Sequence, residues 1–437
     1  MTSNGVGMGH ISRQLATVLA AGQEVRAVVL SLSGALPRVA AAVARGELPE
    51  AEGLDVRWEY CPSWESPWLA SPGRPALLGK AERALRWGPY LRERVVALVR
   101  ETGARALVFD GVAAYPGLLQ ARRALPSVRF AWVRRGMWHP ATPARRLDAS
   151  RHFDLTLSPG DLAEAHDRGP AVGRQDAVRV PPVSLTSVLA PSDRAAARAA
   201  LGLPAEGPVL LLSPGSGVLR PMDELVAEVL GRLRGTPWHV AVTRQAISRV
   251  RVPEADQVTV LDDVYPLARH LAAFDAAVGA AGYNSVHELL GSGVPSLFLP
   301  NPRSTTDDQV ARAEGLAAEG LALVSDGHDL GARLAELLDE ARRAELAAAM
   351  AGLAPLDGAA RAAEAVLELA RTGRPDASPL TTRTPPPWPL RLPPGGPLTS
   401  RLEPGAHRGS PVEHVLAGAS AAYLESRERA AGWVFRR

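Results

Sequence analysis

Short apolar segments alternate with helical patterns along most of this chain, and this alternation constrains its fold more than any other feature of the sequence. The apolar segments are Val25–Leu30, Ala106–Phe109, Val128–Val133, Val209–Leu212, Trp238–Val242, Val258–Leu261, Ala276–Val278 and Ser296–Leu299. Residues at helical spacing lie between them, as in Leu91–Glu101, Met222–Arg234 and Val310–Glu319. Strands that alternate with helices predict βαβ units and parallel sheets. Parallel strands are buried on both faces, which explains why these segments are mainly apolar.

The alternation occurs twice, in a chain of 437 residues that is longer than one core normally supports. A polar, proline-containing stretch over 181–193 separates the two series, and we place the boundary near 185–205. We therefore predict an α/β protein of two Rossmann-like domains that face each other across a cleft. The predicted parts are a first domain over 1–190, a second over 191–372, a Pro-rich linker over 373–411 and a terminal helix over 412–437. That helix packs back on the body, or it contacts a partner or a membrane surface.

The composition excludes several classes of protein. A net charge of +3 is too small for the basic stripe that nucleic-acid binding requires. The single cysteine, Cys61, allows no intramolecular disulfide, and nothing indicates a secretory signal. No apolar run approaches the roughly 20 residues that cross a bilayer. We expect a cytoplasmic protein whose membrane contact, if it has any, is confined to its surface.

A glycine-rich loop ending in His10 opens the first series. Gly5, Gly7 and Gly9 precede a helical stretch, Ile11–Ala20, whose amino end can hold a phosphate or an acceptor group. His10 at the mouth of this loop can act as a general base, since its pKa lies near working pH. The alternatives are an ordinary strand-to-helix turn and a capping histidine. Only two residues precede Ser3, so we expect either a first strand upstream of this sequence or an unusual start, and we favour the first.

A second glycine-rich turn is the strongest signal in the chain. It follows the strand Ala276–Val278 and reads Gly282-Tyr283-Asn284-Ser285, with Glu288 three residues later. Asn284 or Ser285 can cap the next helix, whose amides would face a diphosphate. Glu288 would then accept both hydroxyls of a ribose. The alternative is a capping box formed by Ser285 and Glu288. Gly291, Gly293 and Pro295 are expected to end the helix and lead into the strand Ser296–Leu299.

Three further loops follow strands and should open at the same edge of the sheet, where open α/β sheets bind ligands. Asp308 and Gln309 offer groups suited to sugar hydroxyls, or they only cap the helix that follows. The candidates in the other two loops are Ser213, Gly215, Ser216 and Tyr265. For these two loops an ordinary connecting turn is an equally good interpretation.

In this order, the glycine loop with His10, the Gly282–Ser285 turn with Glu288, and the pair Asp308-Gln309 resemble the GT-B glycosyltransferases. The resemblance is greatest to the MurG-type N-acetylglucosaminyltransferases and to actinobacterial UDP-glycosyltransferases, and it covers about residues 1–370. It implies a UDP-sugar or similar donor and an inverting reaction without a protein-bound metal or other cofactor. It also implies that Glu288 binds the ribose, that Asp308 and Gln309 contact the donor sugar and that His10 lies near the reaction centre. Met8 departs from the family's pattern of adjacent glycines before the histidine.

We expect an acceptor hydroxyl to be deprotonated by His10 or by Asp110, which follows the strand Ala106–Phe109 and could otherwise cap a turn. Aromatic rings and arginines in the first domain can hold a glycan, lipid-linked or small-molecule acceptor, or can be core residues. These are Trp58, Trp64, Trp68, Trp132, Trp138, Arg134 and Arg135. The alternatives are a nucleotide-sugar epimerase or hydrolase on the same fold and a non-catalytic binding protein. A dehydrogenase is disfavoured, because the nicotinamide fingerprint is missing.

Overall fold

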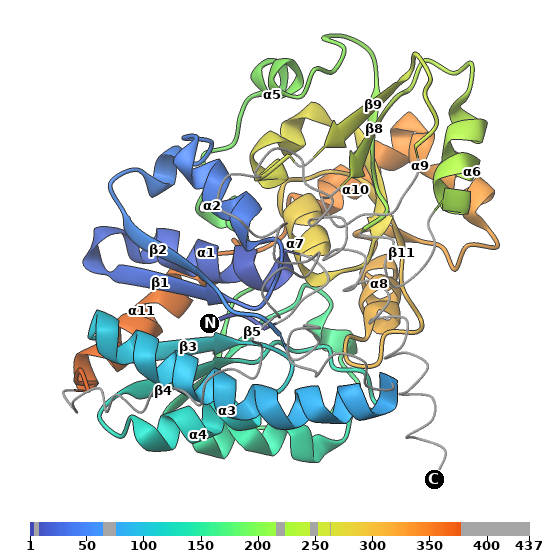
Figure 1. Ribbon diagram of the computed structural model, residues 1–437. Helices are drawn as coiled ribbons and strands as arrows, with labels where there is room; N and C mark the ends of the chain where they lie inside the picture. The colour runs from blue at the N-terminus through green and yellow to red at the C-terminus, as the bar shows by residue number, and fades with distance from the viewer. Residues whose placement is uncertain (4–7, 64–75, 216–222, 245–251, 263, 377–437) are drawn as a thin grey trace.

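Parallel sheets flanked by helices form the body of the molecule (Figure 1). The computed structural model describes residues 1–3, 8–63, 76–215, 223–244, 252–262 and 264–376. The expected terminal helix over 412–437 and nearly all of the expected linker over 373–411 lie outside these described residues.

The second half of the chain forms a six-stranded sheet in the order β12-β11-β10-β7-β8-β9, with every pairing parallel. In chain order its strands number from one to six, and the spatial order is then 6-5-4-1-2-3, the doubly wound order of a Rossmann fold. Its strands are β7 (Val209–Ser213), β8 (His239–Arg244), β9 (Val258–Asp262), β10 (Ala276–Ala280), β11 (Ser296–Leu299) and β12 (Leu323–Val324). The strand order reverses between β7 and β10, where such sheets bind ligands at their carboxyl ends.

The first half contains a parallel pair, β1-β2, and a parallel four-stranded sheet, β3-β4-β5-β6. Residues 1–3 lie between them, because Thr2 forms bridges to both Ser31 in β1 and Asp110 in β3. The Thr2 amide donates to Leu30 O at 2.8 Å, and the Ser3 amide donates to Asp110 O at 2.8 Å. The strands are β1 (Arg26–Ser31), β2 (Asp55–Tyr60), β3 (Ala106–Asp110), β4 (Arg129–Val133), β5 (Leu155–Pro159) and β6 (Val178–Val180). A second switch point therefore lies beside Asp110.

The strands predicted from apolar segments are all confirmed, each within two residues of its predicted ends. The sequence analysis missed β2, β5, β6 and β12. In β2, Asp55, Arg57 and Tyr60 are exposed, as befits a strand at the edge of its sheet. Such a strand carries no continuous apolar run, and β12 is only two residues long. Their pairing thus depends on neighbours that the local sequence does not specify.

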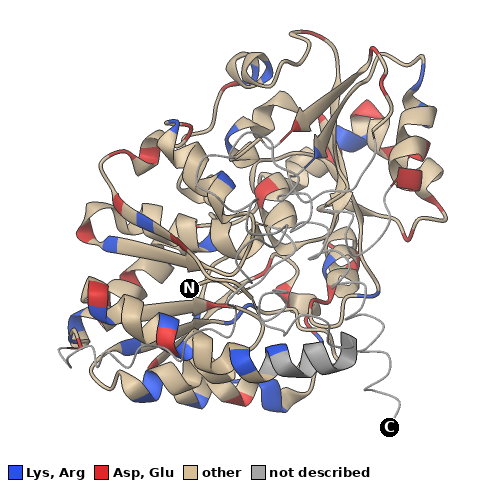
Figure 2. Cartoon of the chain, in the orientation of Figure 1, with Lys and Arg blue, Asp and Glu red and all other residues tan. Residues whose placement is uncertain are grey.

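Helices cover the sheets (Figure 1). They are α1 (Gly9–Ala21), α2 (Leu36–Ala44), α3 (Ala76–Thr102), α4 (Pro116–Ala124), α5 (Arg194–Ala200), α6 (Asp223–Leu233), α7 (Tyr283–Gly291), α8 (Gln309–Ala318), α9 (Leu330–Leu338), α10 (Glu340–Met350) and α11 (Gly358–Thr372). Figure 2 shows acidic and basic residues interspersed over these helices, in keeping with the small net charge.

The helix α11 returns to the first half of the molecule, although the predicted division assigned its residues to the second domain. It lies beside α1 and β3 in Figure 1. Ala359 and Ala362 belong to the same buried cluster as Ile11 and Leu15 of α1. Just past the helix, the Arg374 amide donates to Ser127 O at 2.9 Å. The end of the described chain is thus tied to the sheet that its beginning also joins.

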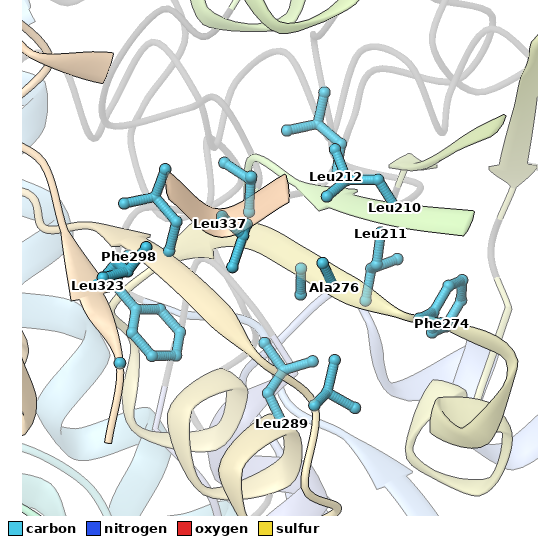
Figure 3. Packing of buried hydrophobic residues seen from close by; sticks show 14 of the residues in the cluster. Leu210, Leu211, Leu212, Phe274, Ala276, Leu289, Phe298, Leu323 and Leu337 are labelled. Carbon is cyan, nitrogen blue, oxygen red and sulfur yellow. The ribbon is translucent and has the colours of Figure 1, made fainter. Parts of the chain in front are cut away.

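The largest buried cluster surrounds the six-stranded sheet (Figure 3). Leu210, Leu211 and Leu212 follow one another in β7 and are all at most 1% exposed, because helices cover both faces of this sheet. The strand β10 carries Gly279 next to β7. A Cβ added at Gly279 would lie 3.0 Å from Ser213 O, so glycine permits the close approach of the two strands at the switch point.

Candidate active site

The amino ends of α1 and α7 meet where the two halves of the chain face each other. The Asn284 side chain in α7 donates from Nδ2 to Gly9 O in α1 at 3.4 Å. Asn284 Oδ1 is buried and accepts no hydrogen bond within the described residues. The first amides of each helix have no intrahelical acceptor, and both helix dipoles direct positive potential toward this point. The arrangement suits a ligand that carries negative charge.

His10, Asp110 and Arg13 form a compact group at this junction. His10 Nδ1 lies 2.6 Å from Asp110 Oδ1. Arg13 contacts the same carboxylate with both arms of its guanidinium, Nε to Oδ2 at 3.0 Å and Nη2 to Oδ1 at 2.7 Å. Asp110 and Arg13 are buried, with side chains 1% and 4% exposed, whereas His10 is 17% exposed. Of the three, His10 is the one a substrate can reach.

Electrostatics in this group favour an uncharged histidine beside an ionised aspartate. Burial lowers the pKa of His10, and the positive charges of Arg13 and Arg135 act in the same direction against Asp110. Burial acts to raise the pKa of Asp110, but Arg13 and His10 outweigh it and hold that pKa below its ordinary value. His10 Nδ1 then donates its proton to Asp110, which leaves Nε2 to accept one.

Glu288 lies near the middle of α7, and its carboxyl group has no partner among the described residues. Burial raises its pKa to about 7. Its side chain is half-buried, and within the described residues it forms no hydrogen bond or ion pair. Burial raises the pKa of the neighbouring Tyr265 phenol, and the charge of Glu288 acts in the same direction. A carboxyl group that is desolvated but unpaired is suited to receive ligand hydroxyls.

The helix α7 begins earlier than expected, because its N-cap residue lies two positions before Asn284 and three before Ser285. Its N-cap residue is Gly282, without a side-chain cap, so the expectation that Asn284 or Ser285 caps the helix is wrong. The alternative, a capping box, is also excluded. The serine of a capping box is the N-cap residue, whereas Ser285 is the third residue inside the helix. The helix ends at Gly291, and Gly293 adopts a φ of +71°, which leads the chain into β11 as expected.

Asp308 and Gln309 begin α8 beside a cavity of about 470 Å³. The Asp308 carboxylate accepts from the Ala311 amide at 3.1 Å and so caps the helix, which was the alternative interpretation of this residue. Gln309 Oε1 accepts from the Asn301 amide at 3.0 Å. The cavity is lined from both halves of the chain, by His139, Pro140, Arg168, Asn301, Pro302, Asp307, Asp308, Gln309 and Val310.

The other candidate residues lie near the two switch points or outside the described chain. Ser213 ends β7 and accepts a hydrogen bond from the Thr243 hydroxyl at 3.2 Å, and Gly215 follows with a φ of +79°. The Tyr265 ring is buried in the core of the first half, with its hydroxyl 3.2 Å from Ser12 Oγ. Its side chain is therefore unavailable, and a nucleobase would have only its backbone to contact. Gly5, Gly7 and Ser216 lie outside the described residues.

Two of the aromatic rings offered for an acceptor are core residues, which was the alternative interpretation. Trp132 is 0% and Trp138 is 1% exposed, and each indole donates to a backbone oxygen, of Gly111 and of Arg135 respectively. Arg134 is also buried, in a double hydrogen bond to Asp176. These side chains stabilise the first half and cannot stack on a substrate. Trp58 packs partly buried against the core, and Trp64 and Trp68 fall outside the described residues.

Sequence reasoning missed Arg13 and Arg312, and it gave Arg135 a role in acceptor binding instead of its place in a buried ion pair. Arg312 in α8 is 0% exposed and pairs with Asp161 of the first half at 2.8 Å. Arg135 pairs with Asp307 at 2.5 Å across the same junction. Arg13 lies three residues after His10 and therefore on the same face of α1, which is the signal that could have identified it. For Arg312 and Arg135 the contacts that join the two halves, to Asp161 and to Asp307 respectively, are to residues more than a hundred positions away, so no local pattern reveals them.

Comparison with known proteins identifies the family of this chain. The model of the glycosyltransferase family 28 C-terminal domain matches residues 241–366, the part that contains α7 and α8. An enzyme named UDP-N-acetylglucosamine--N-acetylmuramyl-(pentapeptide) pyrophosphoryl-undecaprenol N-acetylglucosamine transferase, from Clavibacter michiganensis subsp. michiganensis, is 30% identical over 310 residues, 67% of this chain and 80% of that enzyme. The enzyme of the same name from Leifsonia xyli subsp. xyli is 30% identical over 346 residues, 75% of this chain and 89% of its own. The chain belongs to the MurG-type glycosyltransferases.

Solved structures show that this glycosyltransferase has the GT-B fold of two Rossmann-like domains. The calicheamicin glycosyltransferase CalG4 matches with a TM-score of 0.54 at 17% identity, over 84% of this chain and 96% of its own. MurG of Acinetobacter baumannii matches with a TM-score of 0.52 at 15% identity, over 84% and 98% of the two chains.

Within the described residues, the glycosyltransferase has no cluster of acidic, histidine or cysteine side chains that could hold a metal ion. Asp262, the last residue of β9, forms an ion pair with Arg244 at 2.6 Å. Among the helices of the described chain, none combines the length and the apolar character that a membrane span requires.

Proposed function

We propose that this glycosyltransferase transfers N-acetylglucosamine from UDP-N-acetylglucosamine to a hydroxyl of a lipid-linked glycan, with inversion and without a protein-bound metal. The names of its relatives from Clavibacter and Leifsonia support this choice of donor and acceptor. Such an acceptor would bring the protein to the cytoplasmic surface of a membrane.

The unpaired carboxyl of Glu288 carries the proposal. A desolvated carboxyl without a partner lowers the stability of a folded protein, so a role in binding is needed to explain its position. About one and a half turns of helix separate it from the amino end of α7, where amides can hold a diphosphate. A nucleoside diphosphate bound there would place its ribose hydroxyls beside Glu288, and the carboxylate would accept both of them.

His10 would serve as the general base. Its Nε2 takes the proton of the acceptor hydroxyl, and the resulting oxygen attacks the anomeric carbon from the face opposite the leaving group. The bond from that carbon to the diphosphate breaks, and UDP leaves with the electron pair. Amides at the amino ends of α7 and α1 would stabilise the charge that develops on the leaving phosphate. Asp110 would hold the imidazole in the required tautomer.

Binding of the donor is the direct test. We expect UDP-N-acetylglucosamine to raise the melting temperature of the full-length protein more than dTDP- or GDP-sugars do, because a ligand that binds only the folded state stabilises it. Glu288→Ala should abolish this increase. A UDP-sugar shift that is as large in Glu288→Ala as in the wild type would exclude the proposed donor site.

Turnover tests the base separately. His10→Ala should lower transfer to a lipid-linked acceptor by a factor of about 10²–10⁴, while the UDP-N-acetylglucosamine shift remains. Unchanged turnover would remove His10 from the mechanism. Free N-acetylglucosamine released without an acceptor would instead identify a hydrolase.

A further inference from the structure

A buried arginine, Arg13, joins the pair of side chains that the proposed mechanism uses. Its guanidinium is 4% exposed and contacts both oxygens of Asp110. It also lies over the ring of Tyr283 in α7, with 5.1 Å between the guanidinium carbon and the ring centre. The contacts to β3 and to α7 hold the guanidinium on two sides, so its position is defined by both halves of the protein.

The short contacts around Asp110 fix the proton on His10. Arg13 Nη2 lies 2.9 Å from His10 Nδ1 and 2.7 Å from Asp110 Oδ1. A bare Nδ1 lone pair would face the carboxylate oxygen at 2.6 Å, which places two acceptors against each other. The favourable arrangement has Nδ1–H donating to Oδ1, while Arg13 donates to both carboxylate oxygens. The lone pair of Nε2 then points away from Asp110.

The charge of Arg13 also changes what Asp110 does to His10. A lone carboxylate at this distance would favour the protonated imidazole, which cannot accept a proton from a substrate. The guanidinium offsets that carboxylate. Four other groups face this site. The uncharged Gln14 amide donates from Nε2 to Asp110 Oδ2 at 3.5 Å. Arg135 is itself paired with Asp307, Asn284 of α7 is uncharged, and burial lowers the pKa of the Met1 amino group near Asp110 to about 5.

We propose that Arg13 is a positioning residue: it neutralises and orients Asp110, so that His10 stays uncharged and presents Nε2 to the acceptor hydroxyl. The role of His10 in this statement rests on the proposed function. The charge balance does not, because it concerns only groups of the protein itself.

The test measures the protonation of His10 directly, in the full-length protein without substrate. Histidine-labelled protein is titrated by NMR, with the His10 signal assigned from a His10→Gln variant. We expect Arg13→Met to raise the pKa of His10 by about one unit or more, because Asp110 is then unopposed. Arg13→Lys retains a cation and should leave the pKa much closer to that of the wild type. Arg232→Met removes a half-exposed arginine of α6 as a control and should change nothing.

A His10 pKa that is the same in Arg13→Met and in the wild type would overturn the proposal. If Arg13→Met does not fold, Arg13→Gln replaces it, since the amide retains a hydrogen bond to Asp110 without the charge, and the same rise is expected.

Activity adds a second readout. The acidic limb of the kcat profile, which reports the enzyme–substrate complex, should move to higher pH in Arg13→Met, in the same direction as the pKa of His10 in the free protein. A raised pKa without any transferase activity in the wild type would support the role of Arg13 and contradict the proposed function. An acidic limb that stays in place while the pKa rises would show that His10 is not the base.

Discussion

Burial removes water from both Glu288 and His10, and it shifts their pKa values in opposite directions. In both side chains it disfavours the charged form, so it raises the pKa of the acid to about 7 and lowers that of the base. Asp110 is more deeply buried than either, yet it stays ionised because Arg13 is in contact with it. The difference between Glu288 and Asp110 is therefore the presence of a cation, and the residue without one is left for the ligand.

The pKa of Glu288 predicts how donor binding depends on pH. Only the ionised carboxylate accepts two hydroxyls, so the affinity for UDP-N-acetylglucosamine should increase as the pH rises through about 7 and level off above it. Below that range it should fall by up to about tenfold for each pH unit. Isothermal titration between pH 5.5 and 8.5 measures this. The diphosphate of the sugar nucleotide is fully ionised in this range and adds no titration of its own.

Glu288→Gln is the control for this dependence. It removes the titrating group but keeps an oxygen that accepts one hydroxyl, so its affinity should be weaker and independent of pH. The same pH dependence in this variant would show that another group is responsible.

At the scale of elements, the position of α11 depends on a glycine at its first residue. A Cβ at Gly358 would lie 1.9 Å from the backbone oxygen of Pro181, in the connection between the two halves. Because the obstacle is backbone, no side-chain rotation can relieve it. The helix can pack against the first half only while position 358 has no side chain.

We therefore expect Gly358→Ala to lower the free energy of unfolding by about 1–3 kcal/mol, the usual effect of overpacking. Urea denaturation measures the change. Gly231→Ala is a matched control, since Gly231 lies inside α6 with nothing within 4 Å of the added Cβ. This control should raise the stability by roughly 0.5–1 kcal/mol, because alanine favours helix. A loss of stability in both variants would contradict the role assigned to the contact with Pro181.

At the scale of the whole molecule, buried charges join the two halves next to the site. Arg312 of α8 lies 2.8 Å from Asp161 and 2.9 Å from Asp307, and its side chain is 0% exposed. An antiparallel bridge between Trp138 and Asp307 lies alongside it. The segment that leads to Asp308 is therefore held by the first half, and the cavity beside it is formed by both.

Removal of Arg312 should be costly, because it leaves two buried carboxylates with too little positive charge. We expect Arg312→Met to lower the free energy of unfolding by about 3–5 kcal/mol. Chemical denaturation compares it with Arg333→Met, which breaks ion pairs of a half-exposed arginine and should cost about 1 kcal/mol or less. Similar losses in the two variants would show that the buried network does not stabilise the contact between the halves.

The sequence by itself determined the parts of this protein that depend on local pattern. Fully apolar runs such as Val209–Leu212 fixed the central strands, since a strand buried on both faces needs no alternation. Gly291 and Gly293 indicated the end of α7, whereas its start lies at Gly282 and not at the expected caps. The fold followed from these elements, because the order of strands and helices leaves few topologies. The family was indicated by a resemblance of motifs, chiefly the second glycine turn with Glu288.

Only the tertiary structure decided which side chains are left unpaired. Trp132, Trp138 and Arg134, which were candidates for acceptor binding, are buried structural residues. Asp308 caps its helix. Arg13 gained its place through Asp110, 97 residues away. Whether a polar side chain is satisfied or free depends on neighbours brought together from distant parts of the chain. Local sequence carries no record of those neighbours, so it predicts elements well and the state of a carboxylate such as Glu288 poorly.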